Sequence, residues 1–294
     1  MNARARLANR LAIGSVRGVV VLVVALLLWG LAYLLGHGWA ELTRPGFYTR
    51  APNIGGPGSG VGPQLFNTVY LLLLSMLLTV PIGVAAGIWF AEYAGSGRLT
   101  DFARRATETL ATLPSIVVGL FGFSLFVTAT HTHANRLYAA LALVIINLPY
   151  AIRVTEESLR ALHPSLREGA LALGATRFQA VTRTLLPAAL PGLVTGLILV
   201  AGRVFGEAAA VLFTGSAGAI TPGANYSLNP LLPGDTLAVD LYVFRTQAEP
   251  SAVPDARQYA DGVAALLVVL VLVFNLAARL LGRQVVRRIQ GMQS

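Results

Sequence analysis

Apolar segments of nearly membrane-crossing length recur along the whole chain, and they constrain the fold more than any other feature. A helix needs roughly 20 apolar residues to cross a bilayer. Hydrophobic residues make up 55% of the 294 positions and charged residues only 12%, which excludes a single water-soluble domain. The sequence therefore predicts an all-α, polytopic membrane helix bundle with six transmembrane helices. The six segments are 18–36, 65–90, 113–129, 137–152, 185–214 and 262–281.

The distribution of basic residues predicts which side of the membrane each loop occupies. All 22 basic residues are arginine, and short cytoplasmic loops retain arginine. With the N-terminus inside, sixteen arginines fall in cytoplasmic segments, five fall outside and Arg203 lies within a segment. Both termini are therefore predicted to be cytoplasmic. The net charge of +9 then reflects membrane orientation, and no nucleic-acid partner is expected.

Segment lengths also predict how the chain is divided. The first apolar run is longer than the roughly 7 to 15 residues of a signal-peptide core, so it is read as an uncleaved helix. The predicted parts are an N-terminal region 1–64, with a cytoplasmic tail, the first transmembrane helix and a Gly/Pro-rich outer loop, and a transmembrane core 65–281. A basic cytoplasmic tail, 282–294, follows the core. Within the core lie a cytoplasmic loop 153–187 and an outer loop 215–261.

The cytoplasmic loop has local signals for two helices joined by a tight turn. Leucines at 159, 162, 166 and 173 repeat at helical spacing and form one apolar face. Pro164 suits the first turn of a helix, and Gly174 suits the position just beyond a helix end. Thr176 and Gln179 form a T-x-x-Q capping box that starts a helix running into the membrane. Such an element either inserts into a groove of another protein or lies on the lipid headgroups.

Two opposite charges lie within the fifth apolar segment. Arg203 is sixteen residues beyond Pro187, about 24 Å along a helix, which places it in the outer half of the bilayer. A charge at such a depth costs at least about 2.5 kcal/mol and normally faces a bundle interior or a water-filled path. Glu207 is four residues further on, so the two side chains are expected to share a helix face and to pair. They either line a path for an oxyanion or form a structural ion pair.

The cytoplasmic loop resembles a known family signature. Glu168, Gly169 and Ala170, then Gly174, then Leu186 and Pro187 fall at the intervals of the E-A-A, G and L-P signature in permease subunits of bacterial import ABC transporters. Gly169 replaces the usual Ala and Thr184 the usual branched aliphatic residue. The resemblance implies a type I importer permease fold. It also implies that this loop, including Leu166 and Arg167, couples the membrane helices to an ATPase.

A narrower resemblance concerns the substrate. The R-x-x-G-E pattern of Arg203 and Glu207, together with segments 67–75, 81–94 and 148–181, is similar to the phosphate-importing permeases of the PstA type. This resemblance implies a multi-pass protein of the bacterial cytoplasmic membrane in which Arg203 and Glu207 lie on the phosphate route. It also implies a second permease subunit in a heterodimer, two ATP-binding subunits on the cytoplasmic side and an external phosphate-binding protein. No cofactor is expected.

Other classes of protein are weighed against this interpretation. The same machine could import molybdate or a polyamine, although a cation fits poorly beside Arg203. An ion-coupled carrier usually has several intramembrane carboxylates, and Glu207 is nearly alone. A membrane enzyme needs a cluster of acids, bases or metal ligands; His131 and His133 lack a nearby third ligand. No Gly-Lys-Ser/Thr phosphate loop occurs, so ATP hydrolysis would come from a separate subunit.

Overall fold

The computed structural model describes residues 3–52, 59–216, 226–246 and 256–291, and this part of the chain is helical with no β-strand. Residues 53–58 of the predicted Gly/Pro-rich loop, 217–225 and 247–255 of the predicted outer loop, and 292–294 of the tail lie outside it. The elements are α1 (Ala3–Leu42), α2 (Gly62–Ile88), η1 (Trp89–Tyr93), α3 (Arg98–Thr112), α4 (Ser115–Gly122), η2 (Phe123–Thr128), α5 (Arg136–Arg160), α6 (Pro164–Ala172), α7 (Arg177–Ala180), η3 (Val181–Leu185), α8 (Leu186–Val204), α9 (Ala209–Thr214), α10 (Leu237–Thr246) and α11 (Ala256–Gly291), where η denotes a π-helical segment.

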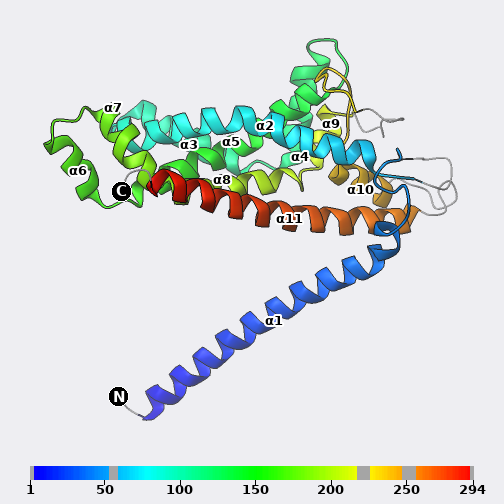
Figure 1. Cartoon of the computed structure of the whole chain (residues 1–294), viewed down its shortest axis with the longest axis horizontal. Helices are drawn as coiled ribbons and strands as arrows, with labels where there is room; N and C mark the ends of the chain where they lie inside the picture. The colour runs from blue at the N-terminus through cyan, green and yellow to red at the C-terminus, as the bar shows by residue number, and fades with distance from the viewer. Residues whose placement is uncertain (1–2, 53–58, 217–225, 247–255, 292–294) are drawn as a thin grey trace.

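The predicted all-α membrane bundle is confirmed. Five helical stretches of the described residues are long and apolar enough to cross a bilayer, and a bent pair makes a possible sixth. The N- and C-terminal ends lie at the same end of the molecule as α6 and α7 (Figure 1), which agrees with the predicted orientation. The five stretches are Asn9–Leu42, Gly62–Tyr93, Arg136–Arg160, Arg177–Val204 and Ala256–Gln284.

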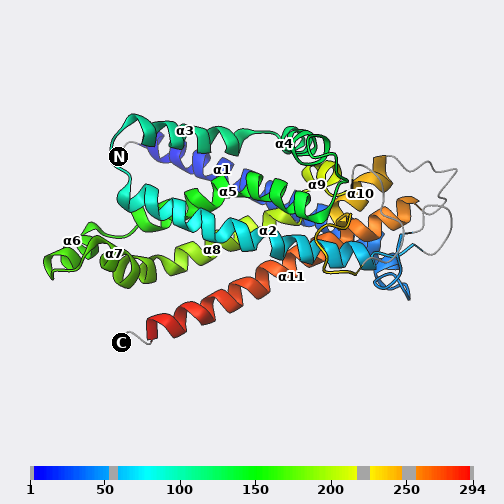
Figure 2. The ribbon, with the colours of Figure 1, turned by 90° about the horizontal axis from the view of Figure 1, so that it is seen from above.

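The bent pair replaces the predicted third span. Residues 113–129 were expected to form one helix, but α4 and η2 together are short, and they join α3 at an angle of 102°. Pro114 causes the bend, because a residue before proline is forced out of the helical region, and Leu113 has an extended ψ of 133°. Helix α3 then lies beside α5 (Figure 2), and its Arg104 pairs with Glu156 of that helix.

The predicted fifth span is also interrupted. Helix α8 ends at Val204, where two tight turns follow: Gly206 N–H donates to the Arg203 carbonyl and Glu207 N–H to the Val204 carbonyl, each at 3.2 Å. The chain resumes as α9, which packs closely on α4. A Cβ on Gly119 would lie 2.9 Å from the carbonyl oxygen of Ala209, so this contact requires glycine. One predicted span is therefore a long helix followed by a short one.

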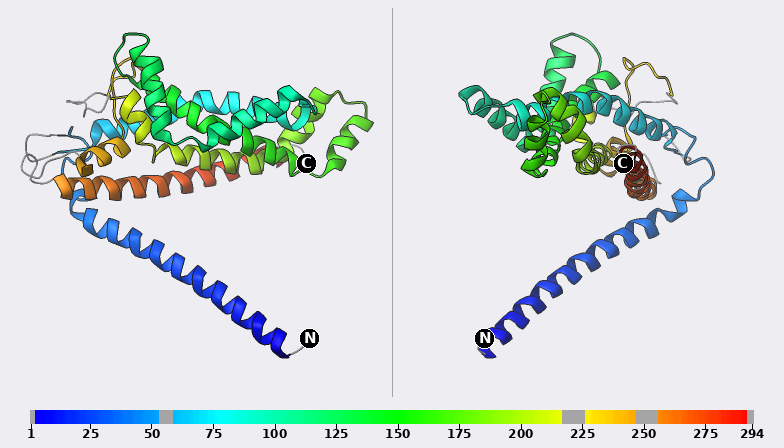
Figure 3. Two further views of the ribbon diagram at one scale, coloured as in Figure 1. Left: turned by 180° about the vertical axis from the view of Figure 1, so that it is seen from behind. Right: turned by 60° about the vertical axis from the view of Figure 1, so that its left-hand side comes forward.

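Helix α1 is set apart from the others. It packs on α11 near its outer end and then diverges from the bundle toward its N-terminus (Figures 1 and 3). Its apolar side chains from Val19 to Trp29 are mostly exposed. The remaining long helices pack together, with α2 against α5 as a central contact: a Cβ on Gly83 would lie 2.6 Å from the Ala151 Cβ. The predicted division at residues 64 and 281 stays a prediction.

Candidate functional site

The cytoplasmic loop folds as its local signals predict. Helix α6 begins at Pro164 after α5 has ended at Arg160. Gly174 has a φ of +82° and turns the chain beyond α6. The capping box is present in both directions: the Thr176 hydroxyl accepts from Gln179 N–H at 3.3 Å, and Gln179 Oε1 accepts from Thr176 N–H at 2.9 Å. The sequence prediction of a helix, a glycine turn and a second helix is confirmed.

The second helix continues into the membrane without a break. Segments α7, η3 and α8 follow one another along a single path (Figure 1). The widened π-turn lies directly before Pro187, which has no N–H to donate, and Leu186 N–H bonds to the carbonyl of Val181, five residues back. Leu186 and Pro187 therefore mark the point where the loop becomes a transmembrane helix. A displacement of α7 would be transmitted directly to α8.

The base of the loop is held by apolar contacts between three helical stretches. Leu159 of α5, Leu185 of η3 and Ala189 of α8 are buried together, and Ile88 of α2 packs against them. Leu159 and Leu185 are only 1% exposed. Because these residues come from the cytoplasmic ends of α2, α5 and α8, the loop is fixed to all three helices. Of the four leucines predicted to form one apolar face, Leu159 is buried in this cluster and Leu162 packs against it, whereas Leu166 and Leu173 are exposed.

An ion pair fastens α6 to η1, the π-helical segment that continues α2. The Arg167 guanidinium binds both carboxylate oxygens of Glu92, and the Nε to Oε2 distance is 2.8 Å. The Glu92 side chain is only 3% exposed. This hydrogen bonding raises the pKa of Arg167. Glu92 was not predicted as a site residue, because its partner is 75 positions away in the sequence.

The tip of the loop exposes apolar side chains on the predicted cytoplasmic side. Leu173 is 91% exposed, and Leu166, Leu171 and Phe178 are also exposed. Glu168 and Gly169 lie on the surface of the same helix. A cluster of exposed apolar residues marks a surface that contacts another protein or the membrane. The tip therefore has the character of a contact surface.

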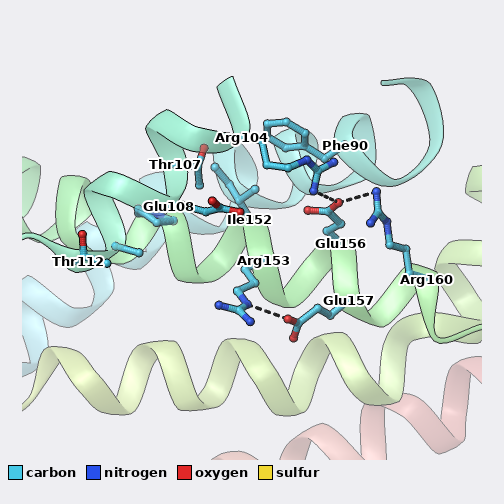
Figure 4. A pocket seen from close by; sticks show the side chains of 12 residues that line it. Phe90, Arg104, Thr107, Glu108, Thr112, Ile152, Arg153, Glu156, Glu157 and Arg160 are labelled. Atoms are coloured by element: carbon cyan, nitrogen blue, oxygen red, sulfur yellow. Dashed lines mark hydrogen bonds and ion pairs between the residues drawn. The ribbon is translucent and has the colours of Figure 1, made fainter. Parts of the chain in front are cut away.

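A cavity of about 390 Å³ lies between α3 and α5 on the same side of the bundle (Figure 4). Glu156 joins the two helices, because it accepts from Arg104 at 2.7 Å and from Arg160 at 2.8 Å. Arg153 pairs with Glu157 at 2.7 Å. The cavity is thus lined by paired arginines and carboxylates, which neutralise one another and leave no cationic group for an anion. The Arg104–Glu156 ion pair at its wall joins α3 to α5.

Arg203 lies against an aromatic ring of the neighbouring helix. The guanidinium carbon is 4.2 Å from the centroid of Tyr150 in α5, and the Tyr150 hydroxyl donates to the Ala111 carbonyl of α3 at 2.9 Å. The Arg203 side chain is exposed on the surface of the chain. Within the described residues it makes no ion pair with an acid. It therefore presents a positive charge that an anion can approach.

The expected ion pair between Arg203 and Glu207 does not form in the structure. The two residues do not share a continuous helix, because α8 ends between them. No ion pair joins them, and Glu207 is buried at 9% exposure while Arg203 is exposed. Spacing of four residues predicts a shared face only while the helix continues. Their assignment to a substrate path remains a prediction.

A buried polar cluster at the opposite end of the bundle was not predicted. Arg136 begins α5 and is completely buried; its guanidinium donates to the Pro233 carbonyl at 3.4 Å and to the Ser227 carbonyl. Nearby, the Tyr259 hydroxyl donates to Asp240 at 2.6 Å. These contacts hold residues 226–246 onto the helices. Their partners are far apart in the sequence, so no local pattern indicated them.

Comparisons with known proteins place the chain among transport proteins. Residues 83–291 match the family described as binding-protein-dependent transport system inner membrane component. A probable ABC transporter permease protein, YqgI of Bacillus subtilis, is 41% identical over 97% of this chain and 98% of its own length. The phosphate transport system permease protein PstA 1 of Mycobacterium tuberculosis H37Rv is 32% identical over 90% of this chain and 85% of its own. PstA of Pasteurella multocida is 30% identical over 86% and 87%.

Solved structures show the same fold at lower sequence identity. A chain of a bacterial alginate ABC transporter, in complex with an alginate-bound periplasmic protein, has a TM-score of 0.61 at 15% identity and covers 97% of this chain and 96% of its own. A chain of the inward-facing MetNI methionine ABC transporter has a TM-score of 0.56 at 21% identity and covers 78% and 94%. These similarities show that the helices are arranged as in ABC importer permeases.

Proposed function

The chain belongs to the binding-protein-dependent transport system inner membrane components, and from this premise we propose that it is the permease subunit of an ATP-driven importer of inorganic phosphate. It is a multi-pass protein of the cytoplasmic membrane. Relatives named as phosphate permeases cover most of the chain at 30 to 32% identity. YqgI, at 41%, carries no substrate in its name, so the phosphate assignment also needs support from the site.

The exposed Arg203 guanidinium is the observation that carries the phosphate assignment. It lies in the outer half of its span, is held by the Tyr150 ring and has no acid partner among the described residues. A guanidinium suits an oxyanion because its planar N–H groups can donate two parallel hydrogen bonds. Glu207, buried a short distance along the chain, would limit how tightly the anion is held. A phosphate ion would thus pass Arg203 without a permanent counter-ion competing for it.

The α6–α7 tip is the proposed docking surface for an ATP-binding subunit. Leu166, Glu168 and Leu173 offer an exposed surface of mixed character, and the docking helix is joined directly to α8 through η3. Arg167 bound to Glu92 would carry the same displacement to α2. The remaining residues of the signature have local structural roles: Gly169 and Ala170 lie in α6, Gly174 forms the turn, and Leu186 and Pro187 begin α8.

The proposed assembly contains a second permease in a heterodimer, two ATP-binding subunits and an external phosphate-binding protein. The chain itself would be non-catalytic, since its sequence has no phosphate loop of the Gly-Lys-Ser/Thr type. ATP-driven closure of the two motors would bring the α6–α7 tips together and open the path outward. Release of phosphate to the cytoplasm would follow hydrolysis.

Phosphate uptake and phosphate-dependent ATPase activity of the co-expressed complex in vesicles test the proposal. Arg203→Ala is expected to abolish phosphate uptake. The control, Arg257→Ala, removes an exposed outer arginine and is expected to keep phosphate uptake. A separate variant tests the docking surface: Glu168→Arg is expected to uncouple or dissociate the ATPase. Unchanged uptake in Arg203→Ala would assign that residue a structural role. Uptake of molybdate or a polyamine in preference to phosphate would reassign the substrate.

A further inference from the structure

A second cavity, of about 450 Å³, lies between α8 and α11. Pro191, Val194, Thr195 and Ile198 of α8 form one wall, and Arg279, Gly282, Arg283 and Arg287 of α11 form the other. A Cβ on Gly282 would lie 2.6 Å from Val194 Cγ1, so the helices meet closely at the floor. The volume is sufficient for a small polar group. The groove therefore has an apolar floor and a basic rim.

Among the described residues, the three arginines have no acidic partner of the kind that lines the first cavity. They are spaced four residues apart, so their side chains lie on neighbouring turns of one face. All three are exposed, and within the described residues none makes an ion pair. Like charges at this spacing repel one another. An anion in the groove would relieve that repulsion.

The position of the groove favours an anion that belongs to the membrane. The C-terminal end of α11 lies at the same end of the bundle as α7 (Figure 1), on the side where the arginines of the chain gather. Leu276, Leu280 and Leu281 are exposed on α11 just where the arginines begin. An apolar surface that ends in a row of arginines matches the boundary between acyl chains and headgroups. Basic grooves between transmembrane helices on the cytoplasmic side bind anionic headgroups.

From this geometry we propose that the α8–α11 groove binds the phosphate group of an anionic lipid in the cytoplasmic leaflet. The arginines would donate to the phosphate oxygens, and the glycerol and upper acyl chain would lie on Val194 and Ile198. The bound lipid would hold the inner half of α8 against α11. Since α8 continues into the α6–α7 loop, such a lipid would stabilise the helix that carries the loop. The site is separate from Arg203.

Lipid binding to the full-length chain tests this site without ATP, partner subunits or transport. The chain is reconstituted in nanodiscs of phosphatidylcholine with increasing phosphatidylglycerol, and the retained lipid is counted by native mass spectrometry. Arg279→Gln/Arg283→Gln is expected to weaken phosphatidylglycerol binding by roughly fivefold or more for each arginine removed. Arg98→Gln/Arg105→Gln removes two exposed arginines of α3 and is expected to bind like the wild type. Millimolar inorganic phosphate is expected to displace no lipid.

Three outcomes would overturn the proposal. If both double variants lose phosphatidylglycerol binding equally, the attraction is a diffuse effect of surface charge. If the wild type retains as much phosphatidylcholine as phosphatidylglycerol, the contact is apolar. Displacement by inorganic phosphate would show a site for the free anion. Arg283→Lys, which keeps the charge but loses the planar fork, is expected to bind at an intermediate level. Equal melting temperatures of all variants in pure phosphatidylcholine confirm that folding is intact, and a loss of phosphate uptake alone would bear only on the proposed transport function.

Discussion

Arg203 lies against Tyr150 and not against Glu207: its guanidinium carbon is 4.2 Å from the centroid of the tyrosine ring. The face of an aromatic ring fixes the orientation of a guanidinium group, and the N–H groups at the edge of the guanidinium remain available to bind an anion. An ion pair with Glu207 would have occupied those groups. The aromatic contact therefore keeps Arg203 fixed and still able to bind an anion.

This relationship predicts different effects of two changes at Tyr150. Tyr150→Leu removes the ring and is expected to raise the KM for phosphate uptake by roughly 2- to 30-fold, the equivalent of a cation–π contact of about 0.5 to 2 kcal/mol. Tyr150→Phe keeps the ring and loses only the hydrogen bond to Ala111, so its KM should stay near the wild-type value. Uptake kinetics of the reconstituted complex measure both. Equal losses would assign the effect to the hydroxyl group.

The Arg167–Glu92 pair predicts a marked loss of stability when the arginine alone is removed. Arg167→Ala leaves the Glu92 carboxylate, 3% exposed, without its partner, and should cost about 1 to 3 kcal/mol. Arg153→Ala breaks an exposed pair with Glu157 and should change stability by less than about 1 kcal/mol. Adding Glu92→Gln to Arg167→Ala should restore part of the loss, since no charge is then buried. Unfolding midpoints of the variants, measured in detergent, give these differences in stability. Equal effects of Arg167→Ala and Arg153→Ala would contradict the prediction.

The sequence predicts those parts of the site that depend on neighbours along the chain. Pro164, Gly174 and the Thr176–Gln179 box each act within one helical turn, and the structure has all three in the predicted roles. Residue types at fixed local spacing suffice for such elements. The helical loop could therefore be described before any tertiary contact was known.

Contacts between distant segments could not be predicted in this way. Glu92 of η1 and Arg167 of α6 are 75 residues apart in the sequence. Buried Arg136 donates hydrogen bonds to carbonyl groups nearly a hundred residues away. The interruption after Val204 has a similar cause: the apolar run continues through it without proline, and α9 is positioned by its contact with Gly119 of α4. Hydropathy alone reports one long segment there. The expected Arg203–Glu207 pair depended on that unbroken helix.

Two glycines of the α6–α7 loop are expected to respond oppositely to alanine. Gly174 has a φ of +82°, so Gly174→Ala should destabilise the loop by about 1 to 2 kcal/mol. Gly169 is helical and has no atom within 4 Å of an added Cβ, so Gly169→Ala should stabilise α6 by roughly 0.5 to 1 kcal/mol. Limited proteolysis of the loop under native conditions measures local opening. Faster cleavage of Gly174→Ala and slower cleavage of Gly169→Ala are expected, and the same direction for both would contradict the assigned conformations.

Because the Asp240 carboxyl group is buried, we expect the stability of the folded chain to decline as the pH rises. Burial raises the pKa of Asp240 well above its usual range, and the nearby Asp235 raises it further, while the hydrogen bond from the Tyr259 hydroxyl opposes the shift. The unfolded chain releases this proton near pH 4, whereas the folded chain retains it to a higher pH. Between those two values the folded state binds more protons, so its stability falls with rising pH. Asp240→Asn has no titratable group at this position and should flatten this part of the pH dependence of stability. The control, Asp101→Asn, changes an exposed acid on α3 and should leave the pH dependence as in the wild type. Melting temperatures recorded from about pH 5 to pH 8 show the difference, and parallel curves for the wild type and Asp240→Asn would mean that the carboxyl group is ionised in the folded protein at these pH values.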